Sequence, residues 1–194
     1  MTKELSITEL LKMAAEAGVN LPHSTNTNAT IDFPATTPKL KHTKGNLLDL
    51  AEAGEYNIIV QGCNCFHTMG SGIAREIRTR YPHAYDADCM QTIKGDRDKV
   101  GKFSIALGKQ FNIINAYTQY SFNAAGKNVD VFEYAGFQTI LDTLALQYPG
   151  CKFGFPYIGM GLAGGDKVRI MAMLENFAQK VTATNGSATL VEFG

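Results

Sequence analysis

From residue 39 onward, short apolar runs alternate with longer segments in which apolar residues recur at helical spacing. A short apolar run bounded by turn residues is typical of a buried strand, and the longer pattern is typical of an amphipathic helix. The short runs predict strands at 40–44, 57–61, 103–107, 111–116, 152–155 and 189–193. The helical spacing predicts helices at 47–53, 72–80, 83–93, 132–147 and 168–180. Strands that alternate with helices indicate a three-layer α/β domain with a mostly parallel sheet.

The first 38 residues differ from the rest of the chain. Apolar residues between Leu5 and Ala14 predict a short helix that ends at Gly18, and residues 22–38 are rich in Thr, Asn and Pro. Such a composition is typical of an extended connector. We therefore divide the chain into an N-terminal helix and connector at 1–38 and one domain at 39–194. The N-terminal segment is expected to be either an appendage packed on the domain or an arm that binds a partner.

Composition narrows the classes of function. Eighteen basic and eighteen acidic side chains cancel among 194 residues, so no net field attracts nucleic acid or an anionic membrane, although a local basic patch is compatible with this balance. No apolar run reaches the roughly 18 residues that a membrane span needs. The N-terminus also lacks the apolar core of a signal peptide. We expect a cytoplasmic protein with no membrane partner and no general nucleic-acid binding.

The four cysteines are expected to be reduced thiols, as is usual in a cytoplasm. Cys63-Asn64-Cys65 is a weak metal-binding pattern, because no second pair of Cys or His stands at zinc spacing. We expect neither a metal nor a cofactor.

Two glycine-rich turns, at residues 62–74 and 156–166, each stand between an apolar strand and a helix. Each turn places backbone N–H groups at the positive end of a helix, where a phosphate is stabilised. Ligands of α/β sheets bind beyond the carboxyl ends of the strands, which is where both turns fall. Two such turns suggest a ligand with two phosphates, such as a nucleoside diphosphate sugar.

The second turn contains Gly159-x-Gly161-x-x-Gly164, which has the form of the dinucleotide fingerprint. That fingerprint belongs in the first strand–helix unit, with an acidic residue about 20 positions later. Here the motif lies near the C-terminus, position 184 is Thr, and no Walker A pattern occurs. A flavin or nicotinamide cofactor and triphosphate hydrolysis are therefore disfavoured. The density of glycine favours a phosphate cradle over a turn that only connects two elements.

Four stretches along residues 39–194 resemble the macro domain, a module that binds ADP-ribose. They are Lys44-Gly45-Asn46-Leu47-Leu48; Cys63-Asn64-Cys65 with Met69-Gly70-Ser71-Gly72-Ile73-Ala74; Ile114-Asn115-Ala116-Tyr117-Thr118-Gln119; and Pro156-Tyr157-Ile158-Gly159-Met160-Gly161-Leu162. The likeness is greatest to the branch of ADP-ribose-1''-phosphate phosphatases and small deacylating ADP-ribosyl hydrolases, which includes phage-encoded members. The resemblance implies a three-layer α/β/α macro-domain fold with a mixed, mostly parallel sheet. For a phage-encoded protein, it implies action in the host cytoplasm.

The resemblance assigns binding roles to matched positions. Asn46 stands where many macro domains have an Asp that recognises the adenine amino group, and simple turn chemistry after Gly45 is the alternative. The first turn is expected to border the distal ribose, and the second to wrap the diphosphate. The sequence leaves open whether the adenine stacks on Tyr157, Phe193 or another ring. The implied ligand-binding residues are Asn46, Gly70, Ser71, Gly72, Ile73, Ala74, Thr118, Tyr157, Ile158, Gly159, Met160, Gly161, Leu162 and Ala163.

Three residues are candidates for catalysis. Asn64 matches an Asn that in this family reaches the distal ribose hydroxyls, and an Asx-turn is its alternative role. His67, in the same turn, is a candidate general acid or base, and a partly exposed loop histidine is the alternative. Asp166 can orient a water molecule, but its position at the start of the last helix also suits an N-cap.

Some positions depart from the relatives. The hydrolase that cleaves ADP-ribosyl-glutamate uses a Lys and an Asp where this chain has Gln119 and Ala163, so no covalent Lys–sugar intermediate can form. Gln61 replaces a His of some phosphatase relatives. The leading expectation is hydrolysis of ADP-ribose-1''-phosphate to ADP-ribose and phosphate, with His67 as proton shuttle and Asp166 orienting water. The alternatives are removal of ADP-ribose from a modified protein or nucleic acid, and binding of ADP-ribose without catalysis.

Overall fold

The computed structural model describes residues 39–121 and 130–194. The helix and connector predicted at 1–38 lie outside the described residues, so the division at residue 38 stays a prediction. In chain order the elements are β1 (Lys41–Lys44), α2 (Leu47–Glu52), β2 (Ile58–Cys63), α3 (Gly72–Arg80), α4 (Pro82–Gln91), η1 (Arg97–Lys99), β3 (Phe103–Ala106), β4 (Asn112–Tyr117), α5 (Tyr134–Gln147), β5 (Lys152–Phe155), α6 (Lys167–Thr182) and β6 (Ser187–Glu192).

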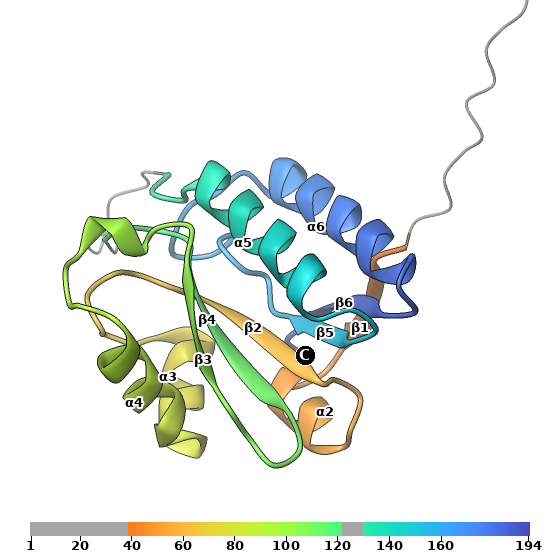
Figure 1. Cartoon of the computed structure of the whole chain (residues 1–194), viewed down its shortest axis with the longest axis horizontal. Coiled ribbons are helices and arrows are strands. Elements are labelled where there is room, and N and C mark those ends of the chain that lie inside the picture. Colours follow the sequence, from red (N-terminus) through yellow and green to blue (C-terminus); the bar gives the residue numbers. More distant parts are fainter. Residues whose placement is uncertain (1–38, 122–129) are drawn as a thin grey trace, which may run out of the picture. The chain divides into compact units, whose positions relative to one another are not determined.

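Every strand and helix predicted within these ranges is present, and the short 3-10 helix η1 is an addition. The strands form one six-stranded sheet in the order β1-β6-β5-β2-β4-β3 (Figure 1). Only β3 and β4 pair in antiparallel fashion, and the other neighbours are parallel. The mixed, mostly parallel sheet is therefore confirmed.

Helices cover both faces of the sheet and make three layers. Alternate residues of β2 point to opposite faces: Ile58 and Val60 belong to the core under α5 and α6, whereas Ile59 packs with α2, α3 and α4. Because both faces are buried, β2 is a nearly continuous apolar run, as is usual for the centre of a parallel sheet.

The register of the sheet brings the two central strands to the same edge. Cys63, the last residue of β2, is paired with Tyr117, the last residue of β4. The first glycine turn follows β2 and the second follows β5, which also pairs with β2. The fold thus places both turns at the carboxyl edge of the sheet.

Two features fix α4 beside this edge. Pro82 begins α4 directly after α3, because the first turn of a helix tolerates a residue without an N–H group. At its other end, Gln91 exchanges two hydrogen bonds with the backbone of Ile105 in β3: Nε2 donates to the carbonyl at 2.8 Å, and Oε1 accepts from the N–H at 3.0 Å. α4 is therefore held firmly against β3.

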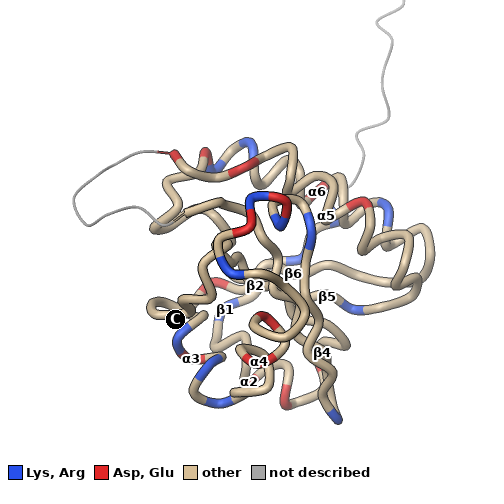
Figure 2. The backbone as a smooth tube through the Cα atoms, turned by 60° about the vertical axis from the view of Figure 1, so that its left-hand side comes forward, with Lys and Arg blue, Asp and Glu red and all other residues tan. Residues whose placement is uncertain are grey.

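Charged residues of both signs are interspersed along the described backbone (Figure 2). None of the helices in the described ranges is long and apolar enough to cross a membrane. The four cysteines, all of them described, are free thiols, as the sequence predicted.

Candidate functional site

A cavity of about 540 Å³ opens between the two glycine turns. The structure brings together there most of the predicted ligand-binding residues, namely Gly70, Ser71, Gly72, Ile73, Ala74, Thr118, Tyr157, Ile158, Gly159, Gly161, Leu162 and Ala163, together with Asn64. Met160 does not line this cavity and its side chain packs against the core under α5 and α6, so its role in binding stays a prediction. Among the described residues that line this cavity, Asp88 alone has an ionisable carboxylate and none is Lys or Arg, so backbone N–H groups and neutral side chains would have to bind an anion.

Gly159 gives the second turn its shape. Its φ of +75° lies in the left-handed region, and a Cβ there would stand 2.3 Å from Cε2 of Phe132. The Gly159 carbonyl accepts a hydrogen bond from the Gly165 N–H at 2.9 Å and closes the turn. Among the described residues, the N–H groups of Gly159, Gly161 and Ala163 have no hydrogen-bond partner. The turn therefore offers free donors to a phosphate.

The first turn leads into a helix without a side-chain cap. Ser71 is the N-cap of α3 but its side chain makes no capping hydrogen bond, whereas Asn46 and Asp166 cap α2 and α6. The residues that begin α3 also line the cavity. An anion in the cavity can take the place of the missing cap.

Asn64 holds the first turn in shape. Its Oδ1 accepts a hydrogen bond from the Phe66 N–H at 2.8 Å, and its Nδ2 donates to Thr68 Oγ1 at 2.7 Å. The Asx-turn alternative is therefore confirmed, and a contact between Asn64 and a ribose stays a prediction. His67 and Met69, in the same turn, have φ of +54° and +36°. Positive φ is uncommon for residues other than glycine and often accompanies functional loops.

A second cavity, of about 660 Å³, shares part of its wall with the first. Gly72, Ile73, Pro156 and Tyr157 line both cavities. Phe193 lines the second cavity, and 76% of its surface is exposed, which is unusual for a large aromatic side chain. The two cavities together thus form one long site with the glycine turns at its middle.

Asn46 lines the second cavity, but its amide is already engaged within the chain. Its Oδ1 accepts from the N–H groups of Leu48 at 2.8 Å and Asp49 at 3.4 Å, and its Nδ2 donates to Glu76 Oε1 at 2.9 Å. The turn-chemistry alternative is confirmed, and the contact with adenine stays a prediction. Glu76, which the sequence did not single out, also lines this cavity.

The structure does not bring Asp166 and His67 into the lining of either cavity. Asp166 is an N-cap, because its Oδ1 accepts from the Arg169 N–H at 2.8 Å. The His67 side chain, only 9% exposed, turns toward α4, where its Nε2 lies 2.9 Å from Thr92 Oγ1 and 3.4 Å from Asp88 Oδ1. The expected approach of His67 to the sugar end of the cavity is therefore corrected, whereas its alternative as a partly exposed loop histidine agrees with the intermediate exposure of the residue.

The environment of His67 favours the neutral imidazole. Thr92 Oγ1 donates to the Asp88 carbonyl at 2.6 Å, so we assign the proton of His67 to Nε2, which donates to Thr92. Burial lowers the pKa of His67, with Lys99 and Lys94 acting in the same direction and Asp88 against them. A neutral imidazole with its N–H engaged is a poor general acid near neutral pH.

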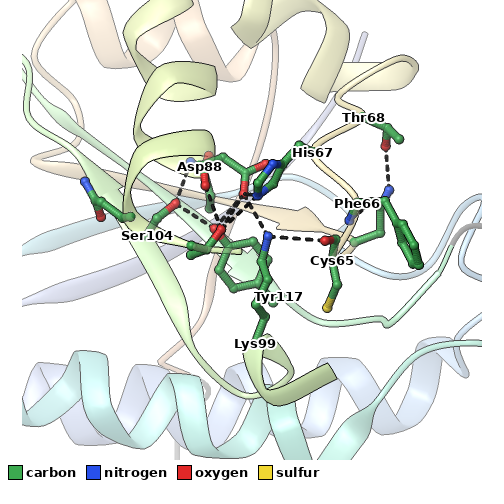
Figure 3. Close-up of polar contacts among 12 residues, drawn as sticks. Cys65, Phe66, His67, Thr68, Asp88, Lys99, Ser104 and Tyr117 are labelled. Atoms are coloured by element: carbon green, nitrogen blue, oxygen red, sulfur yellow. Dashed lines mark hydrogen bonds and ion pairs between the residues drawn. The ribbon is translucent and has the colours of Figure 1, made fainter. Parts of the chain in front are cut away.

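A buried polar cluster behind the first cavity was missed by sequence reasoning (Figure 3). Asp88 Oδ1 lies 3.1 Å from Lys99 Nζ and 2.7 Å from the Tyr117 hydroxyl, and all three side chains are almost fully buried. Asp88 also lines the cavity. The available signal was its position beside Ala84 and Ala87 on the buried face of α4.

Cys63 lines the cavity but is poorly suited to be a nucleophile. Burial, assisted by the negative charge of Asp88, raises its pKa well above the usual range of a thiol. The thiolate is the reactive form of cysteine. Covalent catalysis by Cys63 is therefore disfavoured.

Comparison with known proteins gives one clear sequence relative. The chain matches no established family profile. It is 32% identical over 157 residues to an uncharacterized 17.5 kDa protein from the tk-vs intergenic region of Enterobacteria phage T4, across 73% of this chain and 92% of the phage protein.

Solved structures are similar in fold at low sequence identity. The macrodomain of Mycobacterium tuberculosis DarG superimposes with a TM-score of 0.60 at 19% identity, over 80% of this chain and 98% of that chain. A Trypanosoma brucei macrodomain in complex with ADP-ribose gives a TM-score of 0.56 at 13% identity, over 80% of this chain and 63% of that chain.

Proposed function

Because this chain belongs to the family of the phage T4 17.5 kDa protein and has the macrodomain fold, we propose that it binds ADP-ribose along the two joined cavities. The observation that carries the proposal is the wall that the cavities share, where the two glycine turns meet. ADP-ribose has two bulky ends joined by a diphosphate, which matches two cavities joined at a group of phosphate-binding turns. A macrodomain of the same fold has been solved with this ligand.

Each end of the ligand is assigned to one cavity. The adenosine enters the cavity of about 660 Å³, where Phe193 offers an exposed ring for stacking. The diphosphate accepts hydrogen bonds from the free N–H groups of Gly161 and Ala163 and lies near the uncapped start of α3. The distal ribose enters the cavity of about 540 Å³, beside Asn64 and Thr118.

The reaction assigned to the site is hydrolysis of ADP-ribose-1''-phosphate to ADP-ribose and phosphate. Backbone donors can balance the charge of the substrate, and the cavity admits water beside the distal ribose. Since His67 and Asp166 lie outside the lining, we assign the reaction to groups that do line it. For a relative of a phage protein, the place of action is assigned to the host cytoplasm.

The reaction is tested with purified protein and ADP-ribose-1''-phosphate, followed by phosphorus NMR. Release of inorganic phosphate that depends on enzyme concentration is the expected result. Parallel incubations with ADP-ribosylated protein and ADP-ribosylated DNA separate the alternative hydrolase. Release of ADP-ribose from either, without release of phosphate from the small substrate, would replace the phosphatase assignment. ADP-ribose binding without turnover of any of the three would make the protein a non-catalytic reader.

A further inference from the structure

One oxygen of the Asp88 carboxylate has no partner in the described part of the chain. All the contacts of this carboxylate fall on Oδ1, and Oδ2 makes none, although only 1% of the Asp88 surface is exposed. A buried acceptor without a donor costs free energy, and native proteins rarely leave one unexplained. Because Asp88 lines the first cavity, Oδ2 is the oxygen left to serve an occupant of that cavity.

The surrounding residues fix the carboxylate in place. Lys99 is 3% exposed, and its Nζ lies 3.1 Å from Oδ1 and 3.4 Å from the Cys65 carbonyl. The Tyr117 hydroxyl lies 2.7 Å from Oδ1 and 2.9 Å from Ser104 Oγ. Lys99 of η1 and Tyr117 of β4 both contact one oxygen of Asp88 in α4, and Ser104 of β3 holds the Tyr117 hydroxyl (Figure 3). Such an arrangement preorganises the other oxygen.

The free Oδ2 of Asp88 determines which chemical groups can bind beside it. A carboxylate only accepts hydrogen bonds, so the occupant must bring a hydrogen. A phosphate beside Oδ2 would be repelled, because two negative charges interact strongly away from bulk water. Thr118 Oγ1, which is also buried and without a partner among the described residues, belongs to the same cavity lining. The lining beside Asp88 therefore suits a water molecule next to the sugar and disfavours the phosphate of the substrate.

We propose that Asp88 is the catalytic residue that activates the attacking water, an inference that rests on the hydrolysis proposed above. The water oxygen forms a bond to C1'' of the distal ribose while Asp88 Oδ2 takes one of its protons. The bond between C1'' and the phosphate oxygen breaks, and its electron pair leaves with the phosphate on the opposite face of the sugar. Asp88 then releases the proton to solvent or phosphate. At the anomeric carbon of a sugar, a carboxylate acts either as the nucleophile of a retaining hydrolase or as the general base of an inverting one, and Asp88 takes the second role.

Lys99 and Tyr117 act as positioning residues in this scheme, because they touch Asp88 and not the water. The charge of Lys99 also balances that of Asp88 in the interior, so removing either partner alone leaves a buried charge unpaired. A variant that removes both charges is therefore needed beside the single substitution of Asp88.

The first experiment compares Asp88→Asn with the wild type. Loss of a general base lowers kcat by about 10²- to 10⁴-fold, while affinity for ADP-ribose stays within about threefold because binding does not use the base. Asp86→Asn, an exposed position on the same helix, is the matched control and is expected to keep full activity. If Asp88→Asn does not fold, the double variant Asp88→Asn/Lys99→Met, which removes both buried charges, is assayed in its place.

Several outcomes overturn the inference. A folded variant that keeps kcat within about threefold of wild type excludes a general base, and one that loses ADP-ribose affinity makes Asp88 a binding residue. In both cases wild-type turnover shows that the proposed function stands. If the wild type binds ADP-ribose but turns over nothing, both the hydrolysis and the role of Asp88 fail.

An isotope experiment needs only the wild type. In water enriched in ¹⁸O, attack at C1'' leaves the released phosphate unlabelled, because its oxygens all come from the substrate. Label in the phosphate would mean attack at phosphorus and would refute the assigned step while leaving phosphatase activity intact.

Discussion

Replacing Gly159 by Ala is expected to destabilise the protein, whereas the same change at Gly161, two residues later in the second turn, is expected to leave its stability unchanged. An alanine at 159 must adopt a φ of +75°, and its Cβ would stand 2.3 Å from Cε2 and 2.4 Å from Cδ2 of Phe132. Phe132 cannot simply swing away, because its ring packs edge-on against Tyr134 and Phe137 with centroid separations of 5.1 and 5.3 Å.

The magnitude follows from these two effects. The left-handed conformation costs an L-residue about 1–2 kcal/mol, and an extra methyl group in a packed core costs about 1–3 kcal/mol. Their sum is about 2–5 kcal/mol. Each kcal/mol lowers Tm by about 2–4 °C for a domain of this size. At Gly161 a Cβ would meet nothing within 4 Å, so Gly161→Ala is expected to change stability by less than about 0.5 kcal/mol.

Thermal unfolding followed by circular dichroism measures the difference, and ADP-ribose affinity is measured on the same samples. Since Gly161 lines the first cavity, its added methyl is expected to weaken ADP-ribose binding without changing Tm. Equal Tm values for Gly159→Ala and the wild type would show that the turn accepts a side chain at position 159. A lower Tm for Gly161→Ala would show that the space beside Gly161 is not open.

Three further predictions concern single side chains. Phe193→Ala removes the exposed ring of the second cavity and is expected to weaken ADP-ribose binding by about 1–3 kcal/mol, the value of base–aromatic stacking, as measured by calorimetry; unchanged affinity would exclude Phe193 as the stacking ring. Asp166→Ala loses the N-cap of α6 and is expected to cost about 0.5–2 kcal/mol in urea unfolding with kcat unchanged, whereas lost turnover at unchanged stability would restore a catalytic role. Burial lowers the pKa of His67 in the folded state, so the unfolded state takes up the proton first as pH falls below about 6.5. The contribution of neutral His67 to the free energy of unfolding is therefore full above that pH and is lost as pH falls through the folded-state pKa. His67→Gln should reduce this loss in urea titrations across the range, and an identical pH dependence for the two proteins would contradict the assignment.

The elements of the fold could be predicted because each has a local signal. The apolar run Ile58–Val60 predicts a central strand, and Pro82 separates two helices whatever the rest of the chain does. The glycine turns could be predicted for a similar reason, since Gly159 adopts a conformation that few other residues can. Local chemistry thus decided both the fold and the glycine turns to which we assign the phosphates.

The buried cluster could not be predicted in the same way. Asp88, Lys99 and Tyr117 come from separate elements. Only the packing of α4 and η1 against β4 brings Lys99 Nζ and the Tyr117 hydroxyl to 3.1 and 2.7 Å from Asp88 Oδ1. The direction of the His67 ring was also hidden, because it depends on a positive φ in the turn. For Asn46 and Asp166 the sequence allowed a cap or a site residue, and the observed hydrogen bonds decide for the cap.

Binding of one molecule of ADP-ribose by the two cavities joined at the glycine turns is the proposal on which the other assignments depend. Titration calorimetry of the full chain with ADP-ribose tests it most directly, with AMP and ribose 5-phosphate as the two halves of the ligand. We expect one site with micromolar affinity for ADP-ribose, and much weaker binding of each half because neither spans the shared wall of the cavities. Absence of heat with ADP-ribose, or AMP binding as tightly as ADP-ribose, would contradict it.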